Sequence, residues 1–477
     1  MSLGIYGGYS GPVIHTFLST RSLRVIYFNG QSATLTDTGT LDLQMAILYG
    51  RVPEYPKYNY IYDEDQRARD LCAFAQDLGI DGVVRMNAGF EILLCHWSKS
   101  GVKHIFTKNI TLPGNQARQA NTSLPRDPNR EPSLGFGNAF SQQSSFEWLR
   151  SATWHYGEYG QGGPAFPHMR LDTCTMISLY DPGFTSLNDL HKSRLISDQA
   201  FCNGWGFRQG HRLVKISRAD VKILRERFKQ NAKSVRRCSG ANWDAIAQSI
   251  VSQHKTRLLE ISKALSDEQL SSYDTVNRVH ELSHAIVYPY LEYPFVTRRT
   301  SDEVRDDTIS QCSSVYTSEM KETALSESER LLYKSINIVL ERLCSDEWDL
   351  LEWSEKYTTG LLDKYEKLDV YQIAEELDSK RQLVNRLTTW MGWDNWEQCE
   401  ARCSVDELCA IPTWPVIYAP GFPQGGIYAA INNKTSDQEL AEFWRPKCIN
   451  RFDFDKGGGR GREPAHQLPD VPSSFLE

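Results

Sequence analysis

The pattern of apolar and polar residues divides this chain into two regions of different character. Up to about residue 210, apolar residues come in short runs rich in β-branched and aromatic side chains. Beyond that point they recur with the 3.6-residue period of amphipathic helices, which are predicted at residues 217–230, 243–266, 273–288, 326–344, 347–366 and 371–391. We therefore predict an α+β fold, in which residues 1–210 form a mixed or antiparallel sheet region and residues 211–395 form a helical region packed on it.

Local patterns place individual elements in the first region. Val25–Phe28 is a β-rich run followed by a turn dipeptide, and residues 82–85 and 91–95 predict two further strands around a turn. Residues 63–78 have helical spacing of their apolar positions. One more strand is predicted from Arg170 to Asp181.

Composition excludes several classes of protein. The chain has 477 residues, 40% of them hydrophobic and 24% charged, with a net charge of −7. A chain of this length can bury a core without metal or disulfide support. The negative charge argues against nucleic acid as a partner. No stretch approaches about 18 uninterrupted apolar residues, so no membrane span is predicted.

Eleven cysteines are an unusual feature of this composition. Seven are scattered singly among apolar residues and are expected to be buried thiols. The other four lie close together near the C-terminus, either as disulfides or as a metal knuckle: Cys399, Cys403, Cys409 and Cys448. Their spacing is not that of common zinc sites and no histidine lies among them, so we favour two disulfides. Residues 396–450 are thus predicted to form a cysteine-rich cap, followed by a disordered tail over residues 451–477.

Disulfides favour an extracellular location or the secretory pathway. Three glycosylation sequons, at Asn109, Asn121 and Asn433, agree with this location, although chance supplies about as many in a chain of this length. The N-terminal sequence MSLGIYGGYSGP lacks the basic and apolar regions of a signal peptide. We expect that a signal was removed from this sequence, and an intracellular location is the alternative.

The sharpest chemical motif is His280-Glu281-Leu282-Ser283-His284, an HExxH sequence. On a helix, residues i and i+4 lie on one face, where both imidazoles can bind one zinc ion and the glutamate can take a proton from zinc-bound water. Glu303 follows after eighteen residues, a spacing that resembles the aminopeptidase branch of the gluzincins. That resemblance implies zinc as the cofactor, His280, His284 and Glu303 as its ligands, and Glu281 as the general base.

Three features favour the alternative, a chance match on an amphipathic helix. Arg278 occupies a position that such sites usually keep uncharged. Pro289 and Pro294 interrupt the segment that leads to Glu303. The substrate-binding motifs of aminopeptidases are absent from the sequence.

A second candidate site is the aromatic and glycine-rich segment at residues 146–163. Its rings could form a platform for sugars, and its candidate glycan-binding residues are Trp148, Trp154, Tyr156 and Tyr159. Carboxylates that could act as an acid–base pair nearby are Glu147, Glu158, Asp172 and Asp181. The alternative is that the tryptophans are core anchors and the carboxylates lie at the surface.

Charged residues also interrupt the predicted strand pair at residues 82–95. Asp81, Arg85 and Glu91 stand in or beside apolar strands, where an unpaired charge is costly. They either pair with one another or line a pocket.

Several segments together resemble a group of uncharacterised secreted or membrane-anchored ectodomains from filamentous fungi. The resemblance spans about residues 10 to 450 and depends on residues 24–33, 38–42, 79–95 and 399–415. It implies an extracellular location and one integrated ectodomain with a disulfide-bonded cysteine cap. It implies no activity.

Three hypotheses about function remain open, and the sequence does not decide whether the chain is an enzyme. The first is an extracellular zinc-dependent, peptidase-like hydrolase that uses the HExxH residues and Glu303. The second is a glycan-active or glycan-binding protein that uses the aromatic segment. The third is a non-catalytic, disulfide-bonded interaction ectodomain. The substrate, whether peptide or glycan, is unknown.

Overall fold

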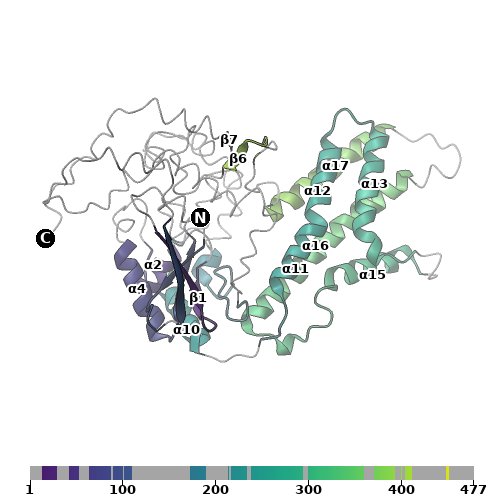
Figure 1. The fold of residues 1–477 in the computed structure, drawn as a ribbon. Coiled ribbons are helices and arrows are strands. Elements are labelled where there is room, and N and C mark those ends of the chain that lie inside the picture. The colour runs from purple at the N-terminus through teal and green to yellow at the C-terminus, as the bar shows by residue number, and fades with distance from the viewer. Residues whose placement is uncertain are drawn as a thin grey trace. The chain divides into compact units, whose positions relative to one another are not determined.

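The computed structural model describes residues 13–28, 42–52, 64–86, 90–99, 101–109, 172–189, 213, 216–233, 238–293, 299–358, 370–392, 399, 403–410 and 447–450. The chain divides into two compact units. Unit 1 comprises Met1–Pro167, Pro182–Ala232 and Glu397–Glu477, and unit 2 comprises His168–Asp181 and Lys233–Trp396. Strands lie in the N-terminal region and helices fill the second half (Figure 1). Disulfides join the C-terminal segments, so the predicted α+β fold is confirmed.

Unit 1 contains a small mixed sheet of strands β2 (Val25–Tyr27), β3 (Gly82–Met86) and β4 (Phe90–Leu94). β2 pairs with β3 in parallel, and β3 pairs with β4 antiparallel. The strands predicted here are confirmed. The helix predicted before β3 is α4 (Glu64–Asp77), whose buried Leu71 and Ala75 lie one turn apart on the same face.

Helix α4 ends as its sequence predicts. Gly79 follows it with a φ of 66°, the left-handed conformation that a glycine adopts without steric cost. Two further helices of unit 1 are α2 (Asp42–Tyr49) and α10 (Arg218–Lys233).

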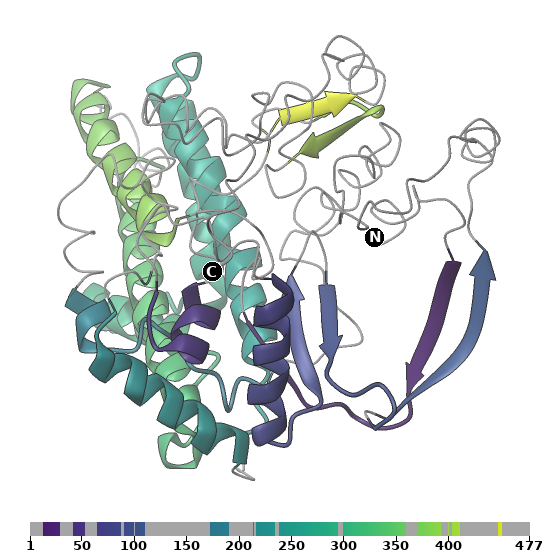
Figure 2. The ribbon, with the colours of Figure 1, turned by 90° about the vertical axis from the view of Figure 1, so that its left-hand side faces the viewer.

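Strands β1 (Val13–Ser19) and β5 (Val102–Asn109) form a separate two-stranded antiparallel ribbon (Figure 2). A register shift between Thr16 and Phe17 marks a β-bulge. One face of the ribbon carries aromatic rings, because Phe17 lies 4.6 Å from the exposed Trp97 ring and 5.2 Å from His104 between ring centroids.

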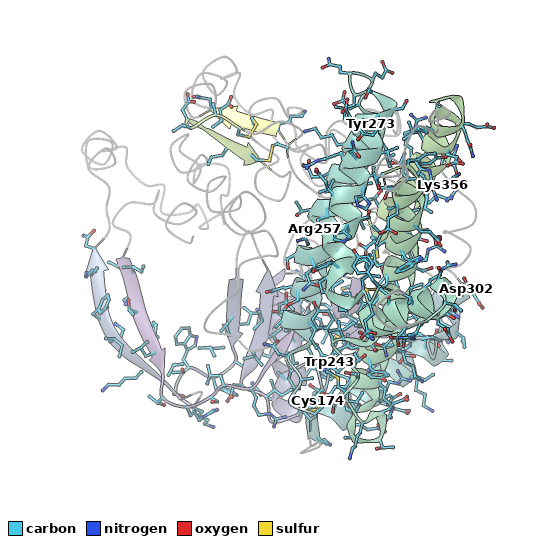
Figure 3. The ribbon with its side chains drawn as sticks, turned by 90° about the vertical axis from the view of Figure 1, so that its right-hand side faces the viewer. Cys174, Trp243, Arg257, Tyr273, Asp302 and Lys356 are labelled. Atoms are coloured by element: carbon cyan, nitrogen blue, oxygen red, sulfur yellow. A yellow bond between two sulfur atoms is a disulfide. The ribbon has the colours of Figure 1, made fainter. Side chains whose placement is uncertain are left out.

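Unit 2 is a bundle of helices, and its side chains are drawn in Figure 3. The helices are α11 (Trp243–Ile250), the π-helical turn η1 (Val251–Lys255), α12 (Thr256–Ser266), α13 (Ser272–Val287), α15 (Ser301–Ser314), α16 (Glu327–Thr358) and α17 (Val370–Met391). Their apolar faces meet in one core that includes Leu258, Val279 and Leu343. Among the described helices, none is long and apolar enough to cross a membrane.

The structure differs from the predicted secondary structure at three places. Residues 172–181 form turns rather than a strand, because the Asp172 carboxylate accepts a hydrogen bond from the Cys174 backbone and turns the chain. The helices predicted at residues 326–344 and 347–366 are one continuous helix, α16, as far as Thr358, since no glycine or proline separates them. Helix α15 was not predicted, because only a few apolar positions mark its buried face.

The expectation of seven single cysteines is wrong for six of them. They form three disulfides, Cys72–Cys95, Cys174–Cys238 and Cys312–Cys344. Their partners are 23, 64 and 32 residues apart, so no local spacing signals the pairs. Cys202 lies outside the described residues.

The predicted disulfides of the C-terminal cap are confirmed. Cys399 pairs with Cys409, and Cys403 pairs with Cys448. The second partners lie in strands β6 (Glu407–Ala410) and β7 (Lys447–Asn450), which are antiparallel. The predicted tail at residues 451–477 lies outside the described residues.

Candidate functional site

Helix α13 carries the HExxH motif, as its apolar spacing predicts. The helix begins at the N-cap Ser271, whose hydroxyl accepts a hydrogen bond from the Asp274 backbone. Val276, Val279 and Ser283 are buried on its core side. This arrangement leaves the two histidines of the motif on the flank of the helix, half-buried.

The two imidazoles lie close together. The ring centroids of His280 and His284 are 5.6 Å apart. His280 Nδ1 lies 3.4 Å from the hydroxyl of Ser354 on α16, and His284 Nε2 lies 3.0 Å from the hydroxyl of Tyr293. Burial, and then the neighbouring His284, lower the pKa of His280, against a smaller opposing effect of Glu281. The structure thus brings together a pair of imidazoles, each with a hydroxyl at one nitrogen.

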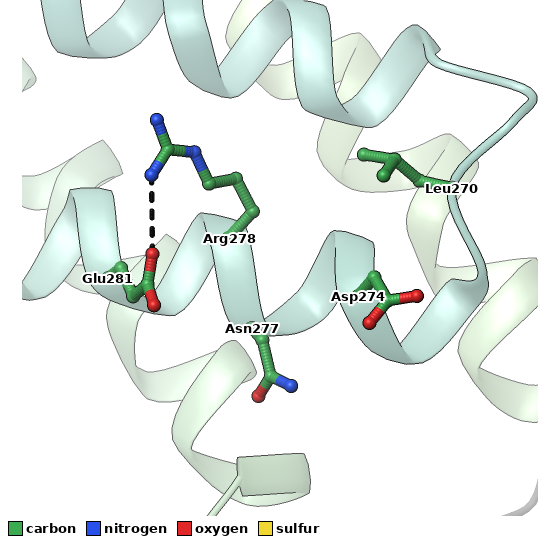
Figure 4. A pocket seen from close by; sticks show the side chains of 5 residues that line it. All are labelled: Leu270, Asp274, Asn277, Arg278 and Glu281. Atoms are coloured by element: carbon green, nitrogen blue, oxygen red, sulfur yellow. Dashed lines mark hydrogen bonds and ion pairs between the residues drawn. The ribbon is translucent and has the colours of Figure 1, made fainter.

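Glu281 points to a different side of α13. Its carboxylate lies 3.3 Å from the Arg278 guanidinium, and both side chains are exposed (Figure 4). Together with Leu270, Asp274 and Asn277 they line a groove of about 520 Å³. The predicted base therefore lines a groove on the exposed side of α13.

Glu303 has a structural role at the start of α15. Its carboxylate accepts hydrogen bonds from the backbone and the hydroxyl of Thr300, at 2.8 and 3.0 Å, while the Thr300 hydroxyl accepts one from the Glu303 backbone. These bonds from Thr300, with a contribution from Arg299, lower the pKa of Glu303. This is a capping box, which the Thr-x-x-Glu spacing of residues 300–303 could have signalled.

The predicted zinc ligands do not form a ready-made cluster. Within the described segments, two sets of three or more metal-ligating atoms lie within 4.8 Å of one another, and neither includes the HExxH histidines or Glu303. Both sets contain cysteines that are bonded in disulfides: Cys399, Cys403 and Cys448 in one, and Asp172, Cys174 and Cys238 in the other. A disulfide sulfur is no longer the thiolate that binds a metal, so these sets have a structural explanation.

Tyr293 connects the histidine pair to a further carboxylate. Burial, followed by the charge of Glu355 and the proximity of Tyr288, raises the pKa of Tyr293. Glu355 lies on α16, directly after Ser354, and is half-buried. No sequence pattern linked this residue to the motif, because it is about seventy positions away in the chain.

A second buried polar pair also had no sequence signal. His254, in the π-helical turn η1, contacts the Glu347 carboxylate of α16 at 2.7 Å. The two side chains are 3% and 0% exposed. Because both lie in the core, they cannot reach a substrate from their present positions, and we assign the pair to the packing of unit 2.

One of the charged residues near the β3–β4 strand pair of unit 1 forms an ion pair. Asp81 pairs with Arg21, at 2.8 and 2.5 Å. Arg85 and Glu91 occupy opposite positions in the β3–β4 ladder.

The candidate glycan-binding residues lie outside the part of the chain that the structure describes. Trp148, Trp154, Tyr156 and Tyr159 lie outside the described residues, as do the sequon residues Asn121 and Asn433. Asn109 is exposed at the end of β5. Glycosylation and glycan binding therefore stay predictions.

Comparisons with known proteins concern mainly unit 1. Residues 10–125 match the model of a family described as the YPL277C N-terminal domain. Two Saccharomyces cerevisiae proteins, the uncharacterized proteins YPL277C and YOR389W, are each 31% identical to this chain over 106 residues. That region is 20% of this chain, and it covers 21% of the first relative and 16% of the second. No solved structure matches the chain.

These matches support a relationship to an uncharacterised fungal family. The matched region contains β1 to β5 with α2 and α4, and includes three of the four segments on which the predicted resemblance depended. The secreted nature of the protein stays a prediction, and no activity comes with the relatives.

Proposed function

We propose that this protein is an extracellular, disulfide-stabilised hydrolase that binds zinc at His280 and His284. The observation that carries the proposal is the pair of half-buried imidazoles on one face of α13, with ring centroids 5.6 Å apart. Two histidines at positions i and i+4 of a helix can bind one ion.

The surroundings of the rings support this proposal. In zinc sites, the histidine nitrogen that does not bind the metal usually has a hydrogen-bond partner, which fixes the orientation of the ring. The Ser354 hydroxyl lies at Nδ1 of His280, and the Tyr293 hydroxyl lies at Nε2 of His284. This arrangement leaves Nε2 of His280 and Nδ1 of His284 to face an ion.

Glu281 is the general base in this proposal. A bound zinc ion lowers the pKa of its water ligand to about 7 and polarises the bond to be cleaved. The Glu281 carboxylate is exposed and pairs loosely with Arg278, so it can turn toward the rings and accept a proton. The adjoining groove would hold the substrate, a peptide or a glycan.

The disulfides support the extracellular part of the proposal. Five disulfides join described segments in both units, and such bonds persist in oxidising compartments. Thiol-reducing systems keep most cytosolic cysteines reduced.

Elemental analysis of the purified chain, loaded with zinc and desalted, tests the binding step. We expect about one zinc per wild-type chain, and loss of this zinc in His280→Ala and His284→Ala, because each variant lacks one imidazole ligand. His96→Ala, which removes an exposed histidine in unit 1, is the control and should keep the metal. Wild-type protein without zinc would overturn the proposal and favour a non-catalytic interaction ectodomain.

A further variant, Glu281→Gln, tests the hydrolytic step. Glu281→Gln should keep the zinc but lose roughly 10²- to 10⁴-fold in turnover of a panel of chromogenic peptide and glycoside substrates. Equal turnover in the wild type and Glu281→Gln would contradict the role of Glu281.

A further inference from the structure

We propose that Glu355, rather than Glu303, is the carboxylate ligand that completes the site of His280 and His284. This inference depends on the proposed function, since it identifies a further ligand of the same zinc site. Glutamate oxygen is a common third protein ligand beside two histidines.

The packing of α13 against α16 brings Glu355 to the level of the histidines. His280 contacts Ser354, whereas Val287, about two turns later on α13, packs in one cluster with Leu351 and Trp348, which precede Ser354 on α16. The two helices are therefore antiparallel. Figure 3 agrees, because Tyr273 at the start of α13 and Lys356 near the end of α16 lie toward the same end of unit 2.

Helix geometry places Glu355 on the side of α16 that faces α13. Glu355 is one turn after Leu351, and residues four apart lie on one face of a helix. Leu351 packs against Val287, so Glu355 lies beside the turn of α13 that precedes Val287, which contains His284. The side chain is half-buried there.

Neighbouring residues link Glu355 to the two rings. Its neighbour in the chain, Ser354, has its hydroxyl 3.4 Å from His280. Its charge acts on Tyr293, whose hydroxyl is 3.0 Å from His284. A carboxylate that is partly removed from water is stabilised by a nearby cation, and a zinc ion between the rings would be one.

Glu303 forms part of a helix cap rather than of the histidine site. Its carboxylate already accepts two hydrogen bonds in the capping box of α15, and a move to the histidines would break both bonds. As described above, no set of ligand atoms within 4.8 Å includes the histidines among the described residues. Binding therefore requires side chains around the two rings to move.

Three matched glutamine variants test this inference by zinc affinity, measured in competition with a chromophoric chelator. Glu355→Gln should weaken zinc binding by at least about 100-fold, more than the loss of an outer-shell partner usually costs. Glu303→Gln should stay within about threefold of the wild type, because glutamine also closes a capping box. Glu341→Gln, which changes an exposed residue fourteen positions earlier on α16, is the control and should also be unchanged.

A fourth variant separates a ligand from a structural residue. Glu355→His should recover zinc binding to within about tenfold of the wild type, since histidine is itself a zinc ligand. The inference would be overturned if Glu303→Gln weakened zinc binding while Glu355→Gln left the zinc affinity unchanged. The proposed function would still stand in that case. Wild-type protein that binds no zinc would overturn both.

Discussion

At the scale of single residues, the His254–Glu347 pair is a buried polar contact in the interior of unit 2. The imidazole Nδ1 lies 2.7 and 3.0 Å from the two carboxylate oxygens, and the side chains are almost fully removed from water. Burial raises the pKa of Glu347, and the neighbouring His254 opposes that effect. The π-helical turn that contains His254 shifts the ring relative to a regular helix, so this local irregularity contributes to the pairing.

Removal of one partner of this pair should be costly. We expect His254→Ala to lower the free energy of unfolding by about 3–5 kcal/mol, because the Glu347 carboxyl is left buried without its partner. A carboxyl with a raised pKa destabilises the fold when it ionises, so the loss should be greater near pH 8 than near pH 5. Urea unfolding at both pH values measures it.

The double variant His254→Leu/Glu347→Met is the control for this prediction. It removes both polar groups and should recover much of the lost stability, since two apolar side chains leave no unpaired charge. A single variant that loses less than about 1 kcal/mol, the typical value of an exposed ion pair, would show that the pair does not matter to the fold.

At the scale of elements, Asp81 joins the beginnings of the parallel strands β2 and β3. Its carboxylate accepts a hydrogen bond from the Arg24 backbone at 2.9 Å, and its own backbone donates one to the Arg24 carbonyl at 2.8 Å. Arg21 adds two bonds from its guanidinium. The hydrogen bond from Arg21 is the largest of the effects that lower the pKa of Asp81; the backbone of Arg24 adds to it, and burial opposes it.

This lowered pKa predicts a pH dependence of stability. A carboxyl whose pKa is lower in the folded state stabilises the fold above its unfolded pKa of about 3.9, and this contribution disappears as the pH falls through the folded value. Asp81→Asn should therefore be less stable than the wild type at pH 7, and the difference should shrink below about pH 4.

Urea titrations from pH 7 to pH 2.5 measure the difference between the two proteins. Asp77→Asn, the same change of charge at an exposed position near the end of α4, should show no such trend. A stability difference for Asp81→Asn that stays constant over this range would contradict the assignment.

At the scale of the whole molecule, disulfides are distributed through both units. Five bridges close loops with sequence separations from 10 to 64 residues. A crosslink lowers the entropy of the unfolded chain, and the effect grows with the length of the loop. The bridges should therefore contribute to stability in addition to the helical core.

Variants of two bridges test this distribution. Cys312→Ala/Cys344→Ala opens a loop of 32 residues and should lower the free energy of unfolding by about 3.5 kcal/mol or more, since both cysteines are also buried in the core. Cys399→Ala/Cys409→Ala opens a loop of 10 residues and should cost less, about 2.5 kcal/mol. Urea unfolding gives both values.

Intact mass verifies the bonds themselves. Reduction should add two hydrogens for each of the five bridges, and the double variants should each add two fewer. A mass that does not change on reduction would show that the cysteines are thiols.

Local patterns in the sequence were sufficient for much of the secondary structure. The helical period predicted α4, α10, α13 and α17, and β-rich runs predicted β2, β3 and β4. The clustered cysteines predicted the bonds of the C-terminal cap. These features depend on residues a few positions apart, whose geometry within a helix, strand or short loop is nearly independent of the rest of the chain.

Tertiary structure alone decided the features that join distant positions. His254 and Glu347 are 93 residues apart, Cys174 and Cys238 are 64 apart, and Ser354 meets His280 across 74 residues. The HExxH motif illustrates the difference. Its helix and its two neighbouring rings follow from the sequence, as does the capping box that holds Glu303, whereas the contact between Ser354 and His280 follows from the packing of α13 against α16. Side chains on separate helices meet only when their apolar faces pack together, and no local spacing contains that information.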